Sequence, residues 1–570
     1  MHYFALATDY DGTLATDGHV NEDTLEALKR LQNSGRKLIL VTGRELDDLL
    51  RVFPQVDLFD YVVAENGALL YSPATREEKL LGAQPPKEFV KLLQERNVDP
   101  LSVGRVIVAT WHPNENTVLQ AIRDLGLELQ VIFNKGAVMV LPSGINKASG
   151  LSAALNEMNL SPHNVVGVGD AENDHAMLNF CEFSVAVANA LPIVKERVDF
   201  VTNNSRGAGV IELIDRMIAS DLSELNDQLQ RHNILLGTTE DDSELNIPAY
   251  GSSILLAGTS GGGKSTLATG VLERIAEQNY QFCIIDPEGD YENFDGAVIV
   301  GDADRSPRIS EVLDLLEQPH QNVILNLLGV ALQDRPAFFA ELLPILQEMR
   351  SRTGRPHWIV VDEAHHEMPA SWNPTELTLP QQFPGLMLIT VHPDQVAAPA
   401  LSLIDTILSV GKSPEENIKQ LCSVVGNFPP KLTPQTLQPG EALVWFRKQN
   451  TEPLRFRFKP GRTERRRHLR KYAEGELGED KSFYFRGAEG KLNLRAQNLI
   501  LFTQMAEGVD DETWLYHLQQ GDYSRWFQEA IKDDSLAQEA EKIEKNPHTS
   551  ANESRTAIKQ AIEQRYTLPA

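Results

Sequence analysis

Two carboxylates stand two positions apart near the N-terminus, directly after a short apolar run. They are Asp9 and Asp11, and the apolar run is residues 4–7. In a strand, this spacing puts both side chains on the same side of the backbone, and Gly12 permits a sharp turn after them. One carboxylate of such a pair can attack phosphorus while the other protonates the leaving oxygen and then activates water. The pair predicts a site at which a phosphoryl group is transferred to an aspartate.

Attack by a carboxylate on a phosphate brings two anions together, so the site needs positive charge and hydrogen-bond donors. Thr42 ends a second apolar run and can donate a hydroxyl, and Lys147 offers an ammonium group. Two more acids follow a third apolar run, at 165–168. Carboxylate oxygens are the ligands that Mg²⁺ prefers in proteins, so we expect a magnesium site. Asp170 and Asp174 complete a set of carboxylate oxygens suited to such an ion.

A second site, of unrelated design, lies in the middle of the chain. Residues 258–265 match the full pattern of a phosphate-binding loop and follow the apolar run 254–257. We expect the loop amides and the N-terminus of the next helix to hold the phosphates of ATP. Lys264 is expected to reach the γ-phosphate, and Ser265 to bind Mg²⁺. The predicted nucleotide-binding residues are Gly258, Thr259, Ser260, Gly261, Gly262, Gly263, Lys264, Ser265 and Thr266.

The strand expected at 358–361 ends in another acidic pair, Asp362 and Glu363. Asp362 is predicted to hold magnesium through water, and Glu363 to polarise the water that attacks ATP. A further expected strand ends close to His392. This histidine either senses the γ-phosphate or has a structural role. Together the loop and the acidic pair predict ATP hydrolysis.

The order of apolar and amphipathic stretches divides the chain, because 570 residues are too many for one hydrophobic core. Residues 1–215 alternate strand-like and helical stretches, as in a parallel α/β sheet, and about 82–140 interrupts them with a small α+β unit. Residues 216–250 are predicted to be a linker with a β-hairpin, and 251–460 a second α/β series. The expected fold is therefore α/β, with two three-layer parallel-sheet domains. A helical C-terminal module at 461–570 ends in a polar tail.

The bulk composition restricts the class of protein. The formal net charge of −27 argues against a surface that generally attracts nucleic acid. No apolar stretch approaches the roughly 20 residues that cross a bilayer, so we expect no membrane contact. The three cysteines lie far apart, which predicts buried thiols in a reducing cytoplasm. One basic run, 459–471, is either a solvated helix face or a contact for phosphate or another subunit.

With these motifs in order, residues 1–215 resemble the haloacid dehalogenase-like phosphatases of the Cof type. The resemblance rests on the strings at 9–13, 42–44, 144–147 and 167–174, with further matches at 65–68 and 188–190. It implies a Rossmann-like core and makes the inserted unit a cap that selects the substrate. The short cap is most similar to those of phosphoglycolate phosphatases, which favours a small phosphorylated metabolite.

The same resemblance implies a role for each candidate residue. Asp9 would be the nucleophile and Asp11 the general acid and base. Thr42 and Lys147 would hold the phosphoryl oxygens, and Asp9, Asp11, Asp170 and Asp174 would form the magnesium site.

Residues 251–460 resemble the HerA/FtsK-type ATPases, which have a RecA-like fold. The most specific matches are the Asp-Pro-Glu-Gly-Asp-Tyr string at 286–291 and the Asp-Glu-Ala-His-His string at 362–366. Members of this family form hexameric rings that move DNA, so the resemblance implies a homo-oligomer, with a hexamer as the candidate form, and ATP as substrate. Two departures leave DNA as an open partner. The sensor strand ends in Val-His where the family usually has Gln, and a single hairpin stands in place of the family's β-barrel.

Three rival interpretations can be weighed. A two-motor helicase needs a second α/β series after about 460, and the sequence has none. A polynucleotide kinase-phosphatase, which processes nucleic-acid ends and has the same domain order, stays open as an alternative, although its kinase half would not need the acidic pair. A regulatory protein in which nucleotide only drives assembly stays open. If a ring forms, an arginine from the next subunit would complete the ATP site, and the candidates are Arg352, Arg355 and the run Arg462–Arg470.

Overall fold

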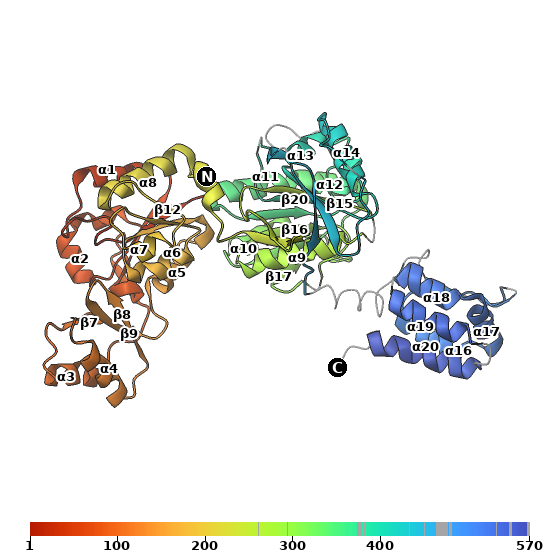
Figure 1. Cartoon of the computed structure of the whole chain (residues 1–570), viewed down its shortest axis with the longest axis horizontal. Coiled ribbons are helices and arrows are strands. Elements are labelled where there is room, and N and C mark those ends of the chain that lie inside the picture. The colour runs from red at the N-terminus through yellow and green to blue at the C-terminus, as the bar shows by residue number, and fades with distance from the viewer. Residues whose placement is uncertain are drawn as a thin grey trace. The chain divides into compact units, whose positions relative to one another are not determined.

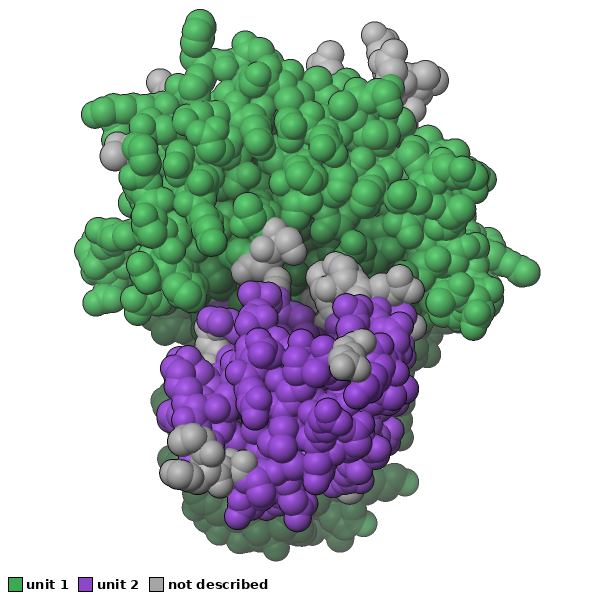
Figure 2. Space-filling view, turned by 90° about the vertical axis from the view of Figure 1, so that its right-hand side faces the viewer, with its two compact units in different colours: residues 1–292, 296–459 green, residues 293–295, 460–570 purple. Residues whose placement is uncertain are grey.

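The computed structural model contains the whole chain and divides into two compact units (Figure 2). The first is Met1–Glu292 with Gly296–Lys459, and the second is Asn293–Asp295 with Pro460–Ala570. No helix of the described residues is long and apolar enough to cross a membrane. The structure describes residues 1–259, 262–292, 294–372, 379–380, 382–432, 434–449, 451–462, 477, 482–488, 490–531, 533–546 and 550–566.

An eight-stranded sheet lies at the centre of the N-terminal domain (Figure 1). Its order is β12-β11-β10-β1-β2-β3-β4-β5, and the strands from β12 to β3 are parallel. In β1, Leu6 packs into one core cluster while Ala5 and Ala7 pack into another, on the opposite face. Burial on both faces explains why these strands are continuous apolar runs. The strands are β1 (Ala5–Thr8), β2 (Lys37–Val41), β3 (Tyr61–Ala64), β4 (Leu69–Ser72), β5 (Glu77–Leu80), β10 (Val165–Gly169), β11 (Phe183–Ala186) and β12 (Phe200–Val201).

Helices cover this sheet, and α1 packs against α8. Helix α8 continues past residue 215, where the sequence suggests a domain boundary, because its face with Leu213, Ile214 and Met217 is buried in the core. The helices are α1 (Glu22–Asn33), α2 (Leu46–Val52), α5 (Lys147–Glu157), α6 (His175–Phe180), α7 (Pro192–Lys195) and α8 (Arg206–Ser220).

The inserted unit is a four-stranded antiparallel sheet with two helices, and it has its own core around Phe89, Leu93 and Val118. Figure 1 shows its strands between the first sheet and the two helices. Buried Glu65 attaches this cap to the core domain, since its carboxylate accepts hydrogen bonds from the backbone N–H groups of Arg105, Val106 and Ile107. The elements are α3 (Lys87–Glu95), β6 (Ser102–Val103), β7 (Val108–Trp111), α4 (Glu115–Asp124), β8 (Leu129–Asn134) and β9 (Ala137–Pro142).

The second domain is built on an eleven-stranded sheet of order β14-β13-β23-β22-β21-β15-β20-β19-β16-β18-β17. The strands from β21 to β17 are parallel, and the other four are antiparallel. The hairpin that the sequence places in a linker therefore extends this sheet, with Gly237 paired to Phe458. The strands are β13 (Ile234–Thr239), β14 (Glu244–Ile247), β15 (Ser253–Gly258), β16 (Phe282–Asp286), β17 (Ala297–Val300), β18 (Asn322–Asn326), β19 (Trp358–Val361), β20 (Leu386–Thr390), β21 (Thr406–Val410), β22 (Glu441–Phe446) and β23 (Leu454–Phe458).

Most helices of the second domain contribute to one large apolar core with the parallel strands. Leu342, Leu343 and Leu346 of the long helix α11 belong to it. The helices are α9 (Lys264–Glu277), α10 (Ile309–Leu316), α11 (Arg335–Thr353), α12 (Ala364–Glu367), α13 (Ala398–Ser402) and α14 (Pro414–Val425).

The two α/β domains meet at the amino ends of their parallel strands. Asn164, just before β10, lies 3.3 Å from Nε2 of His357, just before β19, and donates to the carbonyl of His2. Arg355 is fully buried and donates to the carbonyl of Asn159 and to Oε1 of Gln281. We call this contact region the junction.

The second unit is a small helical module with a two-stranded sheet. The sequence predicts a polar tail beyond about 537, but the structure differs. Helix α20 buries Ile558, Ala561 and Ile562 in the core of the module, because these apolar side chains recur at helical spacing on one face. The elements are β24 (Phe483–Phe485), β25 (Leu494–Ala496), α16 (Leu499–Gly508), α17 (Asp511–Gln520), α18 (Asp522–Trp526), α19 (Asp534–Glu544) and α20 (Ala551–Tyr566).

Candidate functional site

The first candidate site lies at the carboxyl ends of β1 and β10. Asp9 follows β1, Asp174 lies in the turn after β10, and Lys147 is the first residue of α5. Asn146 starts that helix, with a side chain that accepts hydrogen bonds from the backbone N–H groups of Ala148 and Ser149, which fixes the position of Lys147. The ammonium nitrogen of Lys147 is 2.5 Å from Oδ1 of Asp9 and 2.6 Å from Oδ1 of Asp174. All three side chains are buried.

This arrangement shifts the pKa values of Asp9 and Lys147. Burial, followed by the nearby charge of Asp174, raises the pKa of Asp9 to about 7, against the opposing effect of Lys147. Burial works against the charge on Lys147, but Asp174 and Asp9 outweigh it and hold the pKa of Lys147 above its usual value. The site therefore carries more negative than positive charge, which suits the binding of a cation.

The residues present fit a magnesium ion. Ligand oxygens of Asp9, Asp170 and Asp174 all lie within 4.8 Å of one another. Oδ1 of Asp170 is buried and has no hydrogen-bond partner among the described residues, and burial raises the pKa of this carboxyl. A hard cation bound by carboxylates would satisfy that oxygen.

Asp11 is not part of this carboxylate group in the structure. Arg44 holds it instead, with Nε 2.7 Å from Oδ2 and a terminal nitrogen 2.7 Å from Oδ1 of Asp11. Thr42 is buried at the end of β2, and its hydroxyl oxygen accepts a hydrogen bond from the backbone N–H of Arg44. Its hydroxyl hydrogen can still be donated to a ligand.

Three residues near this site were not among the predicted site residues. Lys135, in the turn between cap strands β8 and β9, lies 2.7 Å from Oδ2 of Asp170. Asn189 donates to the carbonyl of Gly12 and approaches the same Asp170 oxygen. Gly12 has φ of +83°, and a Cβ there would lie 2.3 Å from Asp170 Oδ2. The motif strings contain Gly12 and Asn189, whereas no sequence signal marks Lys135.

The second candidate site lies where β15 passes into α9. Gly258 ends the strand, and Lys264 begins the helix after Gly263, whose φ of +96° is left-handed. The N–H of Gly262 donates to the carbonyl of Thr259, and Ser265 and Thr266 lie in the first turn of α9. Ser260 and Gly261 lie outside the described residues. The strand, loop and helix thus have the order that a phosphate-binding loop requires.

Acidic side chains gather around Lys264. Burial lowers the pKa of Lys264, and among the charges that oppose this the largest contributions come from Glu363 and Asp362. Burial, followed by Asp286 and Glu363, raises the pKa of Asp362 to about 8. Asp286 itself accepts hydrogen bonds from the backbone N–H groups of Asp290 and Tyr291, which orders the loop after β16.

Glu363 has an unusual backbone conformation, with φ of +42°. Its Oε2 is buried and accepts no hydrogen bond from the described residues, although Nδ1 of His365 lies 3.5 Å away. Such strain is retained where the surrounding structure holds a functional side chain in place. His365 in turn contacts Thr390 through Nδ1, and His392 lies next to it with ring centroids 5.6 Å apart.

The structure also bears on the arginines predicted to act across a subunit interface. The prediction is wrong for Arg355, because its guanidinium is buried in the junction and forms hydrogen bonds within its own chain. Arg352 is exposed and pairs with Glu317 at the surface. Arg462 is the first arginine of the run Arg462–Arg470, and the other arginines, Arg465, Arg466, Arg467 and Arg470, lie outside the described residues.

Comparisons with known proteins follow this division of the chain. The family model of haloacid dehalogenase-like hydrolases matches residues 6–121 and 103–214, and the model of the central domain of the helicase HerA matches residues 234–368. Phosphoglycolate phosphatase 2 of Saccharolobus solfataricus is 27% identical over 231 residues, which cover 38% of this chain and 94% of that protein. A phosphoglycolate phosphatase of Methanothermobacter thermautotrophicus is 29% identical over 223 residues, covering 38% of this chain and 98% of that protein.

Proposed function

We propose a separate catalytic activity for each half of this chain, which joins a haloacid dehalogenase-like hydrolase domain to a HerA-type P-loop ATPase domain. The N-terminal domain would hydrolyse a phosphomonoester with Mg²⁺, and the second domain would hydrolyse ATP. The observation that carries the first activity is the buried group of Asp9, Lys147 and Asp174. It places the carboxylate nucleophile beside the ammonium group of Lys147.

In the proposed phosphatase reaction, the Asp9 carboxylate attacks phosphorus and the bond to the leaving oxygen breaks. Asp11 gives that oxygen a proton, then takes one from the water that hydrolyses the aspartyl phosphate, so that Asp9 and phosphate are released. For this role, the Asp11 carboxyl group must leave its ion pair with Arg44 and contact the leaving oxygen. Lys147 and Thr42 stabilise the charge on the transferring group. Mg²⁺, held by Asp9, Asp170 and Asp174, would neutralise the charges of the carboxylate and the phosphate when bound.

A small phosphorylated metabolite is the proposed substrate class. The relatives named phosphoglycolate phosphatase support this choice. Lys135 supports it too, because its ammonium group reaches the site from the cap, 2.7 Å from Asp170 Oδ2, where it would attract an anionic substrate.

In the proposed ATPase reaction, the loop that begins at Gly258 holds the phosphates and Lys264 contacts the γ-phosphate. Ser265 and Asp362 would hold Mg²⁺ when it is bound, and Glu363 orients the attacking water. The buried Oε2 of Glu363, without a hydrogen bond from the described residues, supports this role.

We further propose that the ATPase is active as a homo-oligomeric ring in the cytoplasm. All three cysteines are buried and unpaired, which supports a reducing compartment. Native mass with and without ATP and Mg²⁺ tests the ring, and specific ATPase activity should rise with protein concentration. A monomer whose specific activity is independent of concentration contradicts the proposal and favours a nucleotide-regulated protein without a ring.

The phosphatase assignment is tested with Asp9→Asn, which removes the nucleophile at almost constant volume. Hydrolysis of p-nitrophenyl phosphate should fall to background, while ATP binding should be unchanged. The matched control is Asp23→Asn in the exposed first turn of α1, which should keep full activity. Activity of Asp9→Asn equal to that of the unmodified protein contradicts the covalent mechanism.

A further inference from the structure

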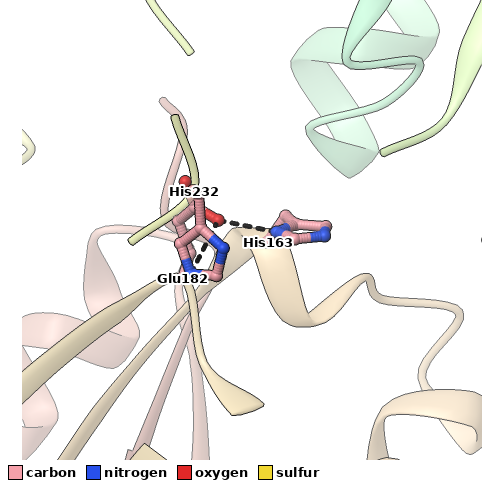
Figure 3. A group of neighbouring side chains, drawn as sticks. All are labelled: His163, Glu182 and His232. Atoms are coloured by element: carbon pink, nitrogen blue, oxygen red, sulfur yellow. Dashed lines mark hydrogen bonds and ion pairs between the residues drawn. The ribbon is translucent and has the colours of Figure 1, made fainter. Parts of the chain in front are cut away.

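A second group of metal-ligating side chains lies in the junction, away from both phosphate sites. His163 precedes β10, Glu182 precedes β11, and His232 lies in the segment that leads to β13 (Figure 3). Glu182 is fully buried, and His163 is almost fully buried. The proposed phosphatase and ATPase reactions use none of the three.

Two imidazoles converge on one carboxylate oxygen in this group. Nδ1 of His163 is 2.6 Å from Oε2 of Glu182, and Nε2 of His232 is 3.8 Å from the same oxygen. The ligand atoms of the three residues all lie within 4.8 Å of one another. Figure 3 shows both rings directed at the carboxylate.

Each ring has one nitrogen that lies beside Glu182, in position to bind a metal ion that replaces a proton there. Nε2 of His163 is 2.7 Å from the backbone carbonyl of Gln278. A carbonyl only accepts, so this nitrogen carries a hydrogen, and the lone pair of a neutral ring is on Nδ1, facing Glu182. Metal-binding histidines commonly donate their second N–H in this way. Nε2 of His232 is buried and has no hydrogen-bond partner among the described residues.

The charge of Glu182 requires a cation. Glu182 is fully buried, and an ionised carboxylate in such a place needs a partner that offsets its charge. The hydroxyl of Tyr280, from the second domain, lies 2.8 Å from both carboxylate oxygens. Arg231 does not neutralise the carboxylate, since its guanidinium binds Asp199 and the backbone carbonyls of Cys181 and Glu182. The charge is therefore balanced by a proton shared with His163 or by a metal ion.

We propose that His163, Glu182 and His232 bind one divalent transition-metal ion, with zinc as the best match. Two imidazoles and one carboxylate are a common ligand set for Zn²⁺. Metal–ligand bonds of about 2.1 Å in tetrahedral geometry separate neighbouring ligand atoms by about 3.4 Å. The present separations of 2.6 and 3.8 Å lie on either side of that value, so small movements of the rings would complete the site. Binding replaces the proton between His163 and Glu182 and releases it, and water takes the fourth position.

The proposed ion would strengthen the junction. Its ligands come from the N-terminal domain and from the segment after α8, while Gln278 and Tyr280 of the second domain contact two of those ligands. This inference does not rest on either proposed reaction, because a structural metal needs no turnover.

The experiment uses the full chain, freed of metal with a chelator and without nucleotide. Excess Mg²⁺ occupies the oxygen ligands of Asp9, Asp170 and Asp174, and Zn²⁺ is then titrated against a chromophoric chelator. Co²⁺ added in a parallel sample reports nitrogen ligands and tetrahedral geometry by its visible absorption. We expect one tightly bound Zn²⁺ per chain and a tetrahedral Co²⁺ spectrum.

The variant His232→Ala tests the assignment, because His232 is the most exposed of the three ligands. It should bind Zn²⁺ at least about tenfold more weakly and lose the Co²⁺ spectrum. The control His320→Ala, at an exposed position, should bind as the unmodified protein does. If His232→Ala does not fold, His232→Gln replaces it. No stoichiometric Zn²⁺, or binding that His232 variants leave unchanged, overturns the proposal and assigns the group to a proton-bridged pair.

Discussion

Replacing Asp9 by asparagine should make the N-terminal domain more stable while removing its activity. In the metal-free protein, the Asp9 carboxylate is buried beside Asp174, and one Lys147 ammonium group serves both. Asparagine has nearly the same shape and removes one of the two negative charges. The free energy of unfolding should therefore rise.

The size of this effect follows from the pKa of Asp9, which is about 7 in the folded protein and 3.8 as its ordinary value. A raised pKa means that the folded state binds the proton more tightly, so stability is lost as the pH rises through the folded value. At about 1.36 kcal/mol for each pH unit, ionisation of Asp9 costs about 2 kcal/mol at pH 5 and at most about 4 kcal/mol above pH 7. For a domain of this size, each kcal/mol moves the unfolding temperature by about 2–4 °C.

Calorimetry of the full chain in EDTA at pH 5 and pH 8 measures the effect. The relevant transition is the one that Mg²⁺ shifts in the unmodified protein, since Mg²⁺ stabilises the state that binds it. Asp9→Asn should unfold several degrees higher at pH 8, with a smaller gain at pH 5, and Mg²⁺ should stabilise it less. Asp23→Asn should leave this transition unchanged. A variant that unfolds at a lower temperature at pH 8, or a gain that does not grow with pH, refutes the electrostatic account of this site.

Three further predictions concern single residues of the two sites. Lys264→Ala should weaken ATP binding, whereas Glu363→Gln should bind ATP normally and lose hydrolysis. Equilibrium binding and turnover assays separate the two, and normal turnover by Glu363→Gln would make that carboxylate structural. Lys135→Ala should lower kcat/KM for small anionic phosphomonoesters about 10–100-fold, the range of a lost charge-assisted hydrogen bond. Steady-state kinetics should show no such loss if this lysine stays outside the substrate site. Gly12→Ala should lose phosphatase activity and Mg²⁺ binding but keep ATP hydrolysis, because its Cβ would collide with Asp170 Oδ2. Full phosphatase activity in that variant would mean that the loop moves aside at little cost.

The sequence predicts the parallel strands of both domains well, and the convergence of Asp9 and Asp174 for the same reason. Carboxyl ends of neighbouring parallel strands meet at one edge of a sheet, so residues that follow separate strands must come together. The pairing of Asp11 with Arg44 could not be predicted, because it depends on side-chain rotation rather than on strand order. Lys135 was missed because a lysine in a hairpin turn is usually solvated, and only the docking of the cap brings it to Asp170.

The burial of Arg355 depends on an association that local patterns do not encode. An arginine before a strand usually faces solvent. Here a second domain covers it, and carbonyls such as that of Asn159, far away in sequence, accept its hydrogen bonds. The antiparallel strands β22 and β23 are absent from the predicted series for a related reason. They are stabilised by pairing, β22 with β21 and β23 with β13 of the hairpin, and a local pattern does not show which distant strand will be the partner.

The position of the junction has a kinetic consequence. It occupies the amino ends of the parallel strands in both domains, with Asn164 before β10 facing His357 before β19. Asp170 and Asp362 follow those strands at their carboxyl ends, so the two sites open on edges that face away from each other. A product released at one site of a chain would have to diffuse through solvent to reach the other. Substrate channelling within one chain is therefore disfavoured. A trapping enzyme should capture any shared intermediate, and dilution should slow its conversion at the second site.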